Sequence, residues 1–198
     1  METQGRNQAV LEGWTRESPA PSHENHGVRF YRFALEVPRL SGQRDLLPVL
    51  ISQEQLSQIS PNEPVRIQGQ FRSFNNRSGA GSRLILTVYA QSVQPALGVP
   101  CNQIFLSGTL CKPPIFRRTP LGRSICDLML AVPRRYGRSD YLPVIAWGQL
   151  AQRTGEFRVG DALELEGRIQ SRIYHKATPD GGMEERTAYE VSMMRLLP

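Results

Sequence analysis

An internal repeat constrains the fold of this chain more than any other feature of its sequence. Residues 37–49 read VPRLSGQRDLLPV and residues 132–144 read VPRRYGRSDYLPV, so eight of thirteen positions match without a gap. The copies lie 95 residues apart, and the same offset relates the segments that begin at Asn7 and Asn102. Compact domains of about 100 residues are common. We therefore expect two similar domains in tandem.

Alternating apolar and polar residues predict the strands of each domain. In residues 30–37, the side chains of Phe33, Leu35 and Val37 fall on one face of an extended chain. A period of two indicates a half-buried strand. Further strands are expected at the start of each copy and at residues 47–51, 65–71, 83–90, 125–132, 142–147, 163–169 and 187–195.

Glycines mark where these strands end or bend. The first strand of each domain is expected to end near Gly13 and near Gly108, respectively. Gly69 and Gly167 lie inside strands. A glycine in a strand interior indicates a bulge or a bend, as the corner of a barrel requires.

Short segments connect the strands. Residues 53–60 and 149–157 are long enough for one or two helical turns, and residues 18–27 and 112–122 indicate loops or hairpin arms. Five strands with a short helix after the third is the order of the OB-fold, a partly open barrel. The expected fold class is all-β, with two tandem five-stranded OB-fold barrels. The expected boundaries are a flexible N-terminus at 1–6, a first domain at 7–94, a linker at 95–101 and a second domain at 102–198.

Basic residues are concentrated in the second domain. The net charge is +6, and the 24 basic residues include two lysines, Lys112 and Lys176. Residues 112–138 contain seven of these cations and one acid, Asp127. Arginine binds phosphate with a planar fork and stacks on rings, so the pattern favours a polyanionic partner. The alternative interpretation is a solvated face, or ion pairs with Asp161, Glu164 and Glu166.

Several classes of protein are not supported by the sequence. No apolar run approaches the ~20 residues that span a bilayer, and no secretory signal pattern opens the chain. Cys101, Cys111 and Cys126 show no CxxC spacing, which argues against a zinc ribbon or a disulfide framework. His23 and His26 lack further ligands for a metal. Without a phosphate-binding loop motif or a catalytic constellation, we expect no enzyme, no cofactor and no metal.

The two copies of the repeat differ at the positions that lie between their shared residues. Asp45 and Asp140 are retained in both copies, and we expect them to cap the turn before Leu-Pro-Val. The second copy carries Arg135, Tyr136, Arg138 and Tyr141 where the first carries Leu40, Ser41, polar residues beside Arg44, and Leu46. The shared residues are those that a strand–loop–strand unit needs to keep its shape. The others are those that a polyanion would touch.

The second domain resembles the bacterial single-stranded DNA-binding (SSB) protein family over about residues 102–195. A spaced series of segments carries the resemblance, at residues 102–110, Pro114, 127–132, 144–151 and 160–172. The first domain resembles this family weakly, mainly through its match to the second. The resemblance implies an OB-fold and single-stranded DNA as the partner. It implies binding with little sequence preference, in DNA replication, recombination or repair.

In that family, aromatic rings on the barrel surface stack on bases, and every base offers a face to a ring. The positions concerned fall on Tyr136, Tyr141, Trp147 and Tyr174. The cations expected to contact the DNA are Lys112, Arg117, Arg118, Arg134, Arg135, Arg138, Arg172 and Lys176. The alternative for any one ring is packing in a core. Trp147 is equally compatible with sealing the barrel end over the helix.

The first domain departs from the family pattern. Its equivalent positions hold Leu40 or Ser41, Leu46, Ser52 and Asn76. Because none of these is a ring, we expect a degenerate domain with a structural or dimerising role. The sequence leaves open a weak contact with nucleic acid through Arg29, Arg32, Arg39 and Arg72. A homodimer would supply the four OB domains that SSB proteins commonly assemble.

The resemblance also bears on partners and location. The chain stops at Pro198 directly after its last strand, so we expect no acidic C-terminal tail for recruiting other proteins. The expected location is the cytoplasm, in association with the nucleoid. One alternative function is an OB-fold adaptor of a primosome, conjugation or phage complex. The other is a single-stranded RNA binder, because stacking separates the two backbones poorly.

Overall fold

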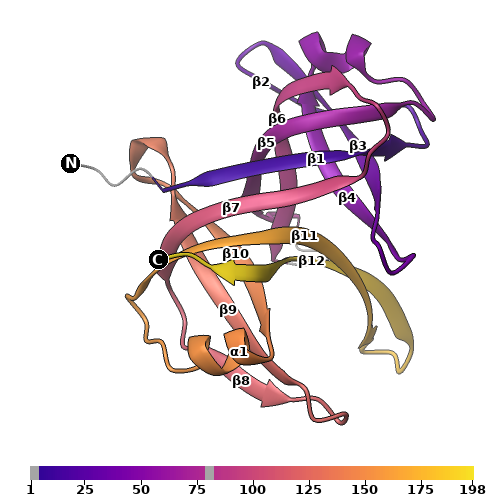
Figure 1. Cartoon of the computed structure of the whole chain (residues 1–198). Coiled ribbons are helices and arrows are strands. Elements are labelled where there is room, and N and C mark those ends of the chain that lie inside the picture. Colours follow the sequence, from indigo (N-terminus) through magenta and orange to yellow (C-terminus); the bar gives the residue numbers. More distant parts are fainter. Residues whose placement is uncertain (1–4, 79–82) are drawn as a thin grey trace.

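The computed structural model describes residues 5–78 and 83–198, so the predicted flexible N-terminus lies mostly outside the described residues. The first barrel comprises β1 (Asn7–Thr15), β2 (Ala20–Asn25), β3 (Val28–Pro38), β4 (Arg44–Ser52), β5 (Pro64–Asn75) and β6 (Leu84–Pro95). The second comprises β7 (Cys101–Leu110), β8 (Ile115–Arg118), β9 (Ser124–Pro133), β10 (Ser139–Trp147), β11 (Ala162–Ala177) and β12 (Met183–Leu196) (Figure 1). The prediction of two tandem OB-fold barrels is confirmed.

Short helices follow the strands where the sequence places them. A 3-10 helix, η1 (Gln53–Gln58), follows β4, and α1 (Gln149–Thr154) follows β10. The segments interpreted as loops or hairpin arms contain β2 and β8, which pair with β3 and β9. Each barrel therefore has a short sixth strand at its edge.

The first strand of each barrel ends two residues after its glycine, as expected from the sequence. β1 continues through Gly13 to Thr15, and near its end it pairs with β3 as well as β5. A Cβ at Gly13 would lie 2.3 Å from the carbonyl oxygen of Glu36, and one at Gly108 would lie 2.5 Å from that of Ala131. Glycine is needed here because the strand approaches a second strand closely to close the barrel.

The bulges predicted at Gly69 and Gly167 are confirmed. The pairing of β5 with β6 shifts register between Gln68 and Gly69, and that of β11 with β12 shifts between Glu166 and Gly167. A Cβ at Gly69 would lie 2.2 Å from the carbonyl oxygen of Tyr89. These bulges bend the two long hairpins around their barrels.

Period-two alternation correctly predicts which side chains form the core. Phe33, Leu35 and Val37 are buried in it, whereas Arg32 and Ala34 are exposed. In β10, Tyr141 and Trp147 are exposed at outward positions, although Ile145 between them is buried. This inward–outward order positions the candidate site.

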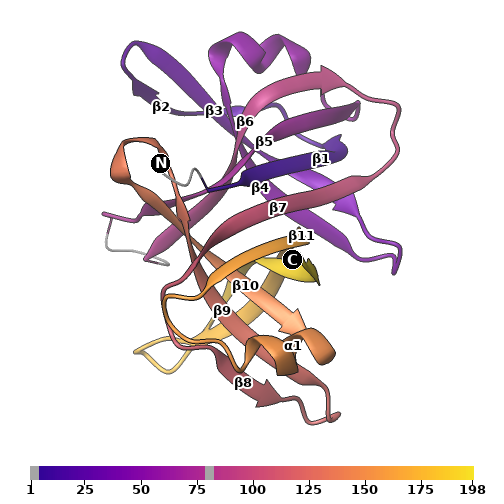
Figure 2. The ribbon, with the colours of Figure 1, turned by 60° about the vertical axis from the view of Figure 1, so that its left-hand side comes forward.

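The two barrels share one sheet. β1 pairs antiparallel with β7, in a register that sets Ala9 opposite Ile104. This pairing joins all twelve strands into a continuous sheet. β1 and β7 lie side by side at the centre of the molecule (Figures 1 and 2), and the hairpin end between β9 and β10 reaches beside the first barrel.

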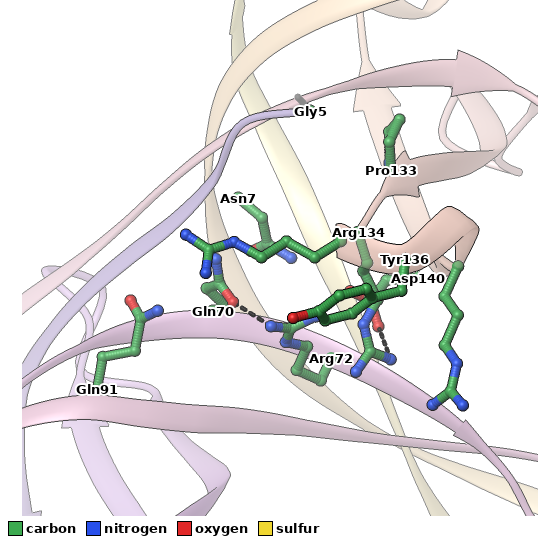
Figure 3. Close-up of a pocket in the computed structure, with 11 residues that line it drawn as sticks. Gly5, Asn7, Gln70, Arg72, Gln91, Pro133, Arg134, Tyr136 and Asp140 are labelled. Atoms are coloured by element: carbon green, nitrogen blue, oxygen red, sulfur yellow. Dashed lines mark hydrogen bonds and ion pairs between the residues drawn. The ribbon is translucent and has the colours of Figure 1, made fainter. Parts of the chain in front are cut away.

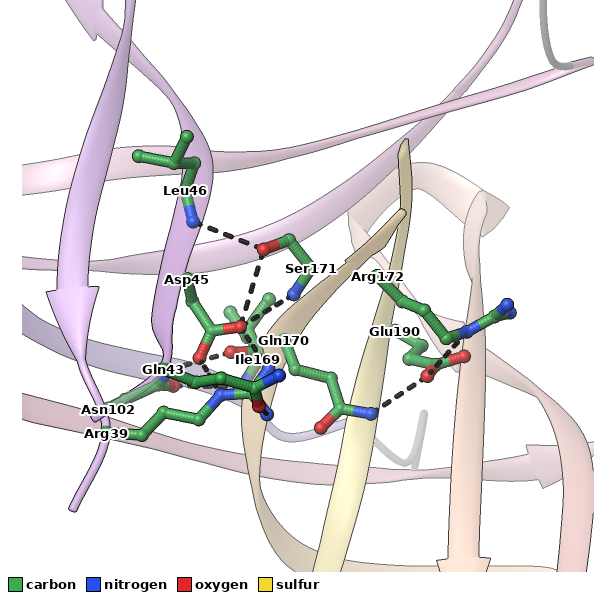
Figure 4. A network of polar contacts seen from close by, with 10 residues as sticks. All are labelled: Arg39, Gln43, Asp45, Leu46, Asn102, Ile169, Gln170, Ser171, Arg172 and Glu190. Carbon is green, nitrogen blue, oxygen red and sulfur yellow. Dashed lines mark hydrogen bonds and ion pairs between the residues drawn. The ribbon is translucent and has the colours of Figure 1, made fainter. Parts of the chain in front are cut away.

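Asp45 and Asp140 fasten the barrels to each other, which corrects their interpretation as turn caps. Asp140 accepts a hydrogen bond from the backbone N–H of Ser73 in β5 at 2.9 Å, and the Ser73 hydroxyl accepts one from the N–H of Tyr141 at 2.7 Å. Asp45 likewise accepts from the N–H of Ser171 in β11 at 2.9 Å (Figure 4). Each barrel thus contributes one aspartate that accepts a hydrogen bond from the backbone of the other barrel.

Arginines hold both aspartates in position. Asp45 is fully buried and accepts a 2.7 Å hydrogen bond from Nε of Arg39, which raises the pKa of that guanidinium. Asp140 is fully buried and contacts Arg72 at 3.2 Å and Arg134 at 3.4 Å. Buried charges persist only when they are paired and hydrogen-bonded. Arg39 and Arg134 therefore hold the aspartates of the junction in position, in addition to contributing positive charge.

Candidate nucleic-acid interface

The outer face of β10 carries two aromatic rings. Tyr141 is 48% exposed and Trp147 is 40% exposed, whereas Leu142, Val144 and Ala146 point into the core between them. Tyr141 and Trp147 therefore lie on the same side of this strand as Pro143, which is half-buried, and Ile145, which is buried. Exposure at this level does not fit the alternative that these rings pack in a core.

Tyr174 lies on the long hairpin of the second barrel. It is half-buried on β11, and the guanidinium carbon of Arg172 lies 5.8 Å from the centre of its ring. β12 separates β11 from β10 in the sheet. Tyr174 therefore lies on a different strand from Tyr141 and Trp147, with β12 between the two strands.

Tyr136 lies at the tip of the β9–β10 hairpin, in the single turn η2 (Arg135–Gly137). Its backbone has φ +63°, and Gly137 follows at φ +64°. A left-handed conformation is uncommon for a residue with a bulky side chain. Here it turns the ring outward, and Tyr136 is 94% exposed.

The predicted cations divide into paired and unpaired groups. Three pair with acids: Arg117 with Asp127 at 2.8 Å, Arg134 with Asp140 at 3.4 Å and Arg172 with Glu190 at 3.6 Å. The exposed cations that form no ion pair within residues 5–78 and 83–198 are Lys112, Arg118, Arg135, Arg138 and Lys176. These five are available to phosphates without breaking a contact.

The acids proposed as alternative partners of this cluster contact other groups. Glu164 pairs with Arg6 at 3.7 Å, and Glu166 pairs with Arg195. Asp161 accepts a hydrogen bond from the backbone N–H of Arg158. The basic cluster therefore keeps most of its charge at the surface.

A groove of about 550 Å³ lies where the hairpin tip meets the first barrel. Figure 3 shows Tyr136 and Arg134 from the hairpin facing Gln70 and Arg72 on β5. The groove is lined by Gly5, Asn7, Gln70, Arg72, Gln91, Pro133, Arg134, Arg135, Tyr136, Arg138 and Asp140. Both barrels therefore contribute to its walls.

The groove is electrostatically positive. Four arginines line it, and one acid, Asp140, contacts two of them. Burial and the neighbouring charge of Arg134 lower the pKa of Arg72. Guanidinium groups nevertheless stay charged in proteins. The groove therefore has an excess of positive charge and is suited to binding an anion.

On the wall that the first barrel supplies, the sequence left a contact through Arg72 open and did not predict Gln70 or Gln91. Gln70 and Arg72 alternate with buried Phe71, so the sequence pattern did place them on an outer face. Nothing in that pattern indicates that the β9–β10 hairpin covers this face. The predicted sites Lys112, Arg117 and Arg118 lie instead near β8, outside the groove.

The first copy of the repeat presents a different surface. Leu40, at the position of Arg135, is fully exposed, and Leu46, at the position of Tyr141, is half-exposed. Its exposed aliphatic side chains offer neither a ring face nor a cation. The repeat therefore preserves the aspartate contact in both barrels and varies the residues around it.

Other features of the chain contribute no site. Burial raises the pKa of the thiols of Cys101, Cys111 and Cys126, which are not disulfide-bonded. His23 stacks on Phe30 with ring centres 4.9 Å apart. Among the described residues, no group of three or more potential ligands could hold a metal, and no helix has the length and apolar character to cross a bilayer.

Comparison with known proteins adds an independent observation. Residues 101–197 match the model of the single-strand binding protein family. The single-stranded DNA-binding protein of Thermus thermophilus is 42% identical over 107 residues, covering 52% of this chain and 39% of that protein. Single-stranded DNA-binding protein B of Bacillus subtilis is 32% identical over 80 residues, covering 37% of this chain and 71% of that protein. The matched region thus spans about two-fifths of the Thermus relative.

A solved structure resembles the whole chain. The wild-type single-stranded DNA-binding protein from Thermus aquaticus superimposes with a TM-score of 0.79 at 24% sequence identity. The match covers 98% of this chain and 93% of that one. At this identity the likeness concerns the fold, and it extends through both barrels.

Proposed function

Because the chain belongs to the single-strand binding protein family, we propose that it binds single-stranded DNA with little sequence specificity. Rings on the second barrel stack on bases, and unpaired cations contact phosphates. The protein acts as a binding protein rather than an enzyme, in replication, recombination or repair. The protein is then located in the cytoplasm, bound to DNA at the nucleoid.

One observation carries this proposal. Exposed rings and cations without an acidic partner occur together on the second barrel, at Tyr136, Tyr141 and Trp147 and at Arg135 and Arg138. An isolated ring would be compatible with a core role, and an isolated cation with a solvated surface. Their combination on the second barrel is what a flexible, charged strand with stacking bases requires.

Titration with poly(dT) is expected to quench the fluorescence of Trp147, because a base stacked on the indole replaces water at its exposed face. Neutralising about three to five phosphates gives a plot of log K against log salt with a slope of about −2 to −3.5. The measurement is fluorescence titration at several salt concentrations. Trp147→Phe is the control that separates this signal from that of Trp14, the other tryptophan.

The outcomes of this titration separate the candidate functions. Failure to bind poly(dT) even at low salt would contradict the proposal. Tighter binding to poly(U) than to poly(dT) would favour an RNA-binding protein. Binding of neither polymer would favour the adaptor whose main partner is protein.

We further propose that the first barrel, residues 7–94, has a structural or dimerising role and that two chains assemble four barrels. Light scattering after gel filtration is expected to give a mass twice the 22.3 kDa of the chain. Symmetric dimers are the commonest assemblies of soluble proteins. A mass equal to one chain across the concentration range would contradict the dimer.

A further inference from the structure

We propose that the groove between the barrels is a nucleotide-binding site to which both barrels contribute. A bound single strand then passes from the second barrel onto the first. This inference rests on the proposed function and extends it, because it gives the first barrel a direct contact with DNA. The ligand is one nucleotide unit of a single strand, recognised through its base and its phosphate.

The second barrel supplies the ring and the free charges of this site. Tyr136 is exposed at the tip of the β9–β10 hairpin, where its ring lies over the groove (Figure 3). Arg135 and Arg138 flank it and form no ion pair with any described residue. A base stacking on this ring would bring its phosphates beside two unpaired cations.

The first barrel supplies polar groups on the opposite wall. Gln91 is exposed on β6, and its amide makes no hydrogen bond to the part of the chain that the structure describes. Gln70 accepts a hydrogen bond from Arg72, whose guanidinium is held in place by Asp140. An amide both donates and accepts, so Gln91 can bond to a base edge or to a phosphate.

The dimensions of the groove agree with this ligand. Its volume of about 550 Å³ lies within the roughly 300–1,000 Å³ of sites that hold small molecules. It is open to solvent along the surface rather than enclosed, because exposed side chains such as Gln91 and Arg138 form its rim. A nucleotide unit of a longer strand can therefore enter it from the surface.

The outer face of the first barrel offers a continuation of the path. Tyr89 lies between the buried residues Val88 and Ala90 of β6, so its ring points outward. The ring of Tyr89 lies 6.2 Å from that of Phe30, which stacks on His23. The first barrel thus has rings on its outer face, at positions other than those that carry them in the second barrel.

The equivalent junction on the other side of the molecule lacks these groups. Leu40 and Ser41 stand at the positions of Arg135 and Tyr136. The strand pairings of the two barrels place Met194 in β12 where Gln91 lies in β6. Both junctions keep the aspartate contact, so Arg135, Tyr136 and Gln91 are not needed for joining the barrels.

Reversing the charge at Gln91 tests this inference in both directions. Gln91→Glu places a negative charge in the groove and is expected to weaken poly(dT) binding about fivefold, and Gln91→Arg is expected to strengthen it about fivefold. The matched controls are Gln94→Glu and Gln94→Arg. Gln94 is an exposed residue of the same strand that does not line the groove. Affinities are measured by fluorescence titration on the full chain.

Opposite effects of the two Gln91 variants, several-fold larger than those of the Gln94 pair, support the inference. A folding defect cannot produce this result, because it would not strengthen binding. Equal effects at the two positions, or equal affinity of all four variants and the unmodified chain, overturn the inference and leave the proposed function intact. Absence of poly(dT) binding by the unmodified chain overturns the proposed function itself.

Discussion

Replacing Tyr136 and Tyr141 together with alanine is expected to weaken poly(dT) binding about thirtyfold or more. Each stack between a ring and a base contributes roughly 1–3 kcal/mol, and both rings are accessible. Neither side chain belongs to the core, so the substitutions remove ligand contacts without opening a cavity. Fluorescence titration on the double variant, with Trp147 retained as the reporter, measures the loss.

The repeat provides the control for this experiment. Leu40→Ala with Leu46→Ala removes two exposed side chains from the first copy of the same loop. We expect this variant to bind poly(dT) almost as tightly as the unmodified chain, after circular dichroism shows that all variants are folded. Equal losses in the two double variants would mean that the second copy of the loop has no special part in binding.

Asp140→Ala is expected to lower the free energy of unfolding by about 3–5 kcal/mol, the cost of removing one partner from a buried ion pair. The carboxylate of Asp140 is fully buried, and its loss leaves two largely buried guanidinium groups without their counter-charge and the N–H of Ser73 without its acceptor. Asp45→Ala is expected to have an effect of similar size, because Asp45 makes the same contact with Ser171. Urea denaturation followed by circular dichroism measures both changes.

Asp127→Ala is the matched control for these substitutions. Asp127 also forms an ion pair with an arginine, Arg117, but both side chains are well exposed. Exposed pairs contribute about 0–1 kcal/mol. Should Asp140→Ala cost no more than Asp127→Ala, the contact between the barrels would not stabilise the fold.

The two aspartates also explain why the repeat is better preserved at some positions than at others. Asp45 and Asp140 have to reach across a barrel boundary, and they need Arg39 and Arg134 beside them. These four residues are identical between the copies. Arg135 and Tyr136 have no such structural partner, so their replacement by Leu40 and Ser41 in the other copy leaves the junction intact.

The fold of each barrel could be predicted from the amino-acid sequence alone. Alternation of apolar and polar residues identified the faces of β3 and β10, because successive side chains of a strand point to opposite sides. Gly69 and Gly167 marked the bulges, because only glycine allows a carbonyl oxygen to approach so closely at those points. These are local properties of the chain, and a single sequence contains them in full.

The way in which the barrels meet, and the residues at their junction, could not be predicted from the sequence and are seen in the three-dimensional structure. Ser73 is 67 residues from Asp140 in the sequence, and no periodic pattern links them. β1 pairs with β7 along one register, and that pairing carries the β9–β10 hairpin over Gln70, Arg72 and Gln91. The loop of the repeat was recognisable from the sequence, but its opposite wall was not, because contacts between domains depend on packing over long distances rather than on neighbouring residues.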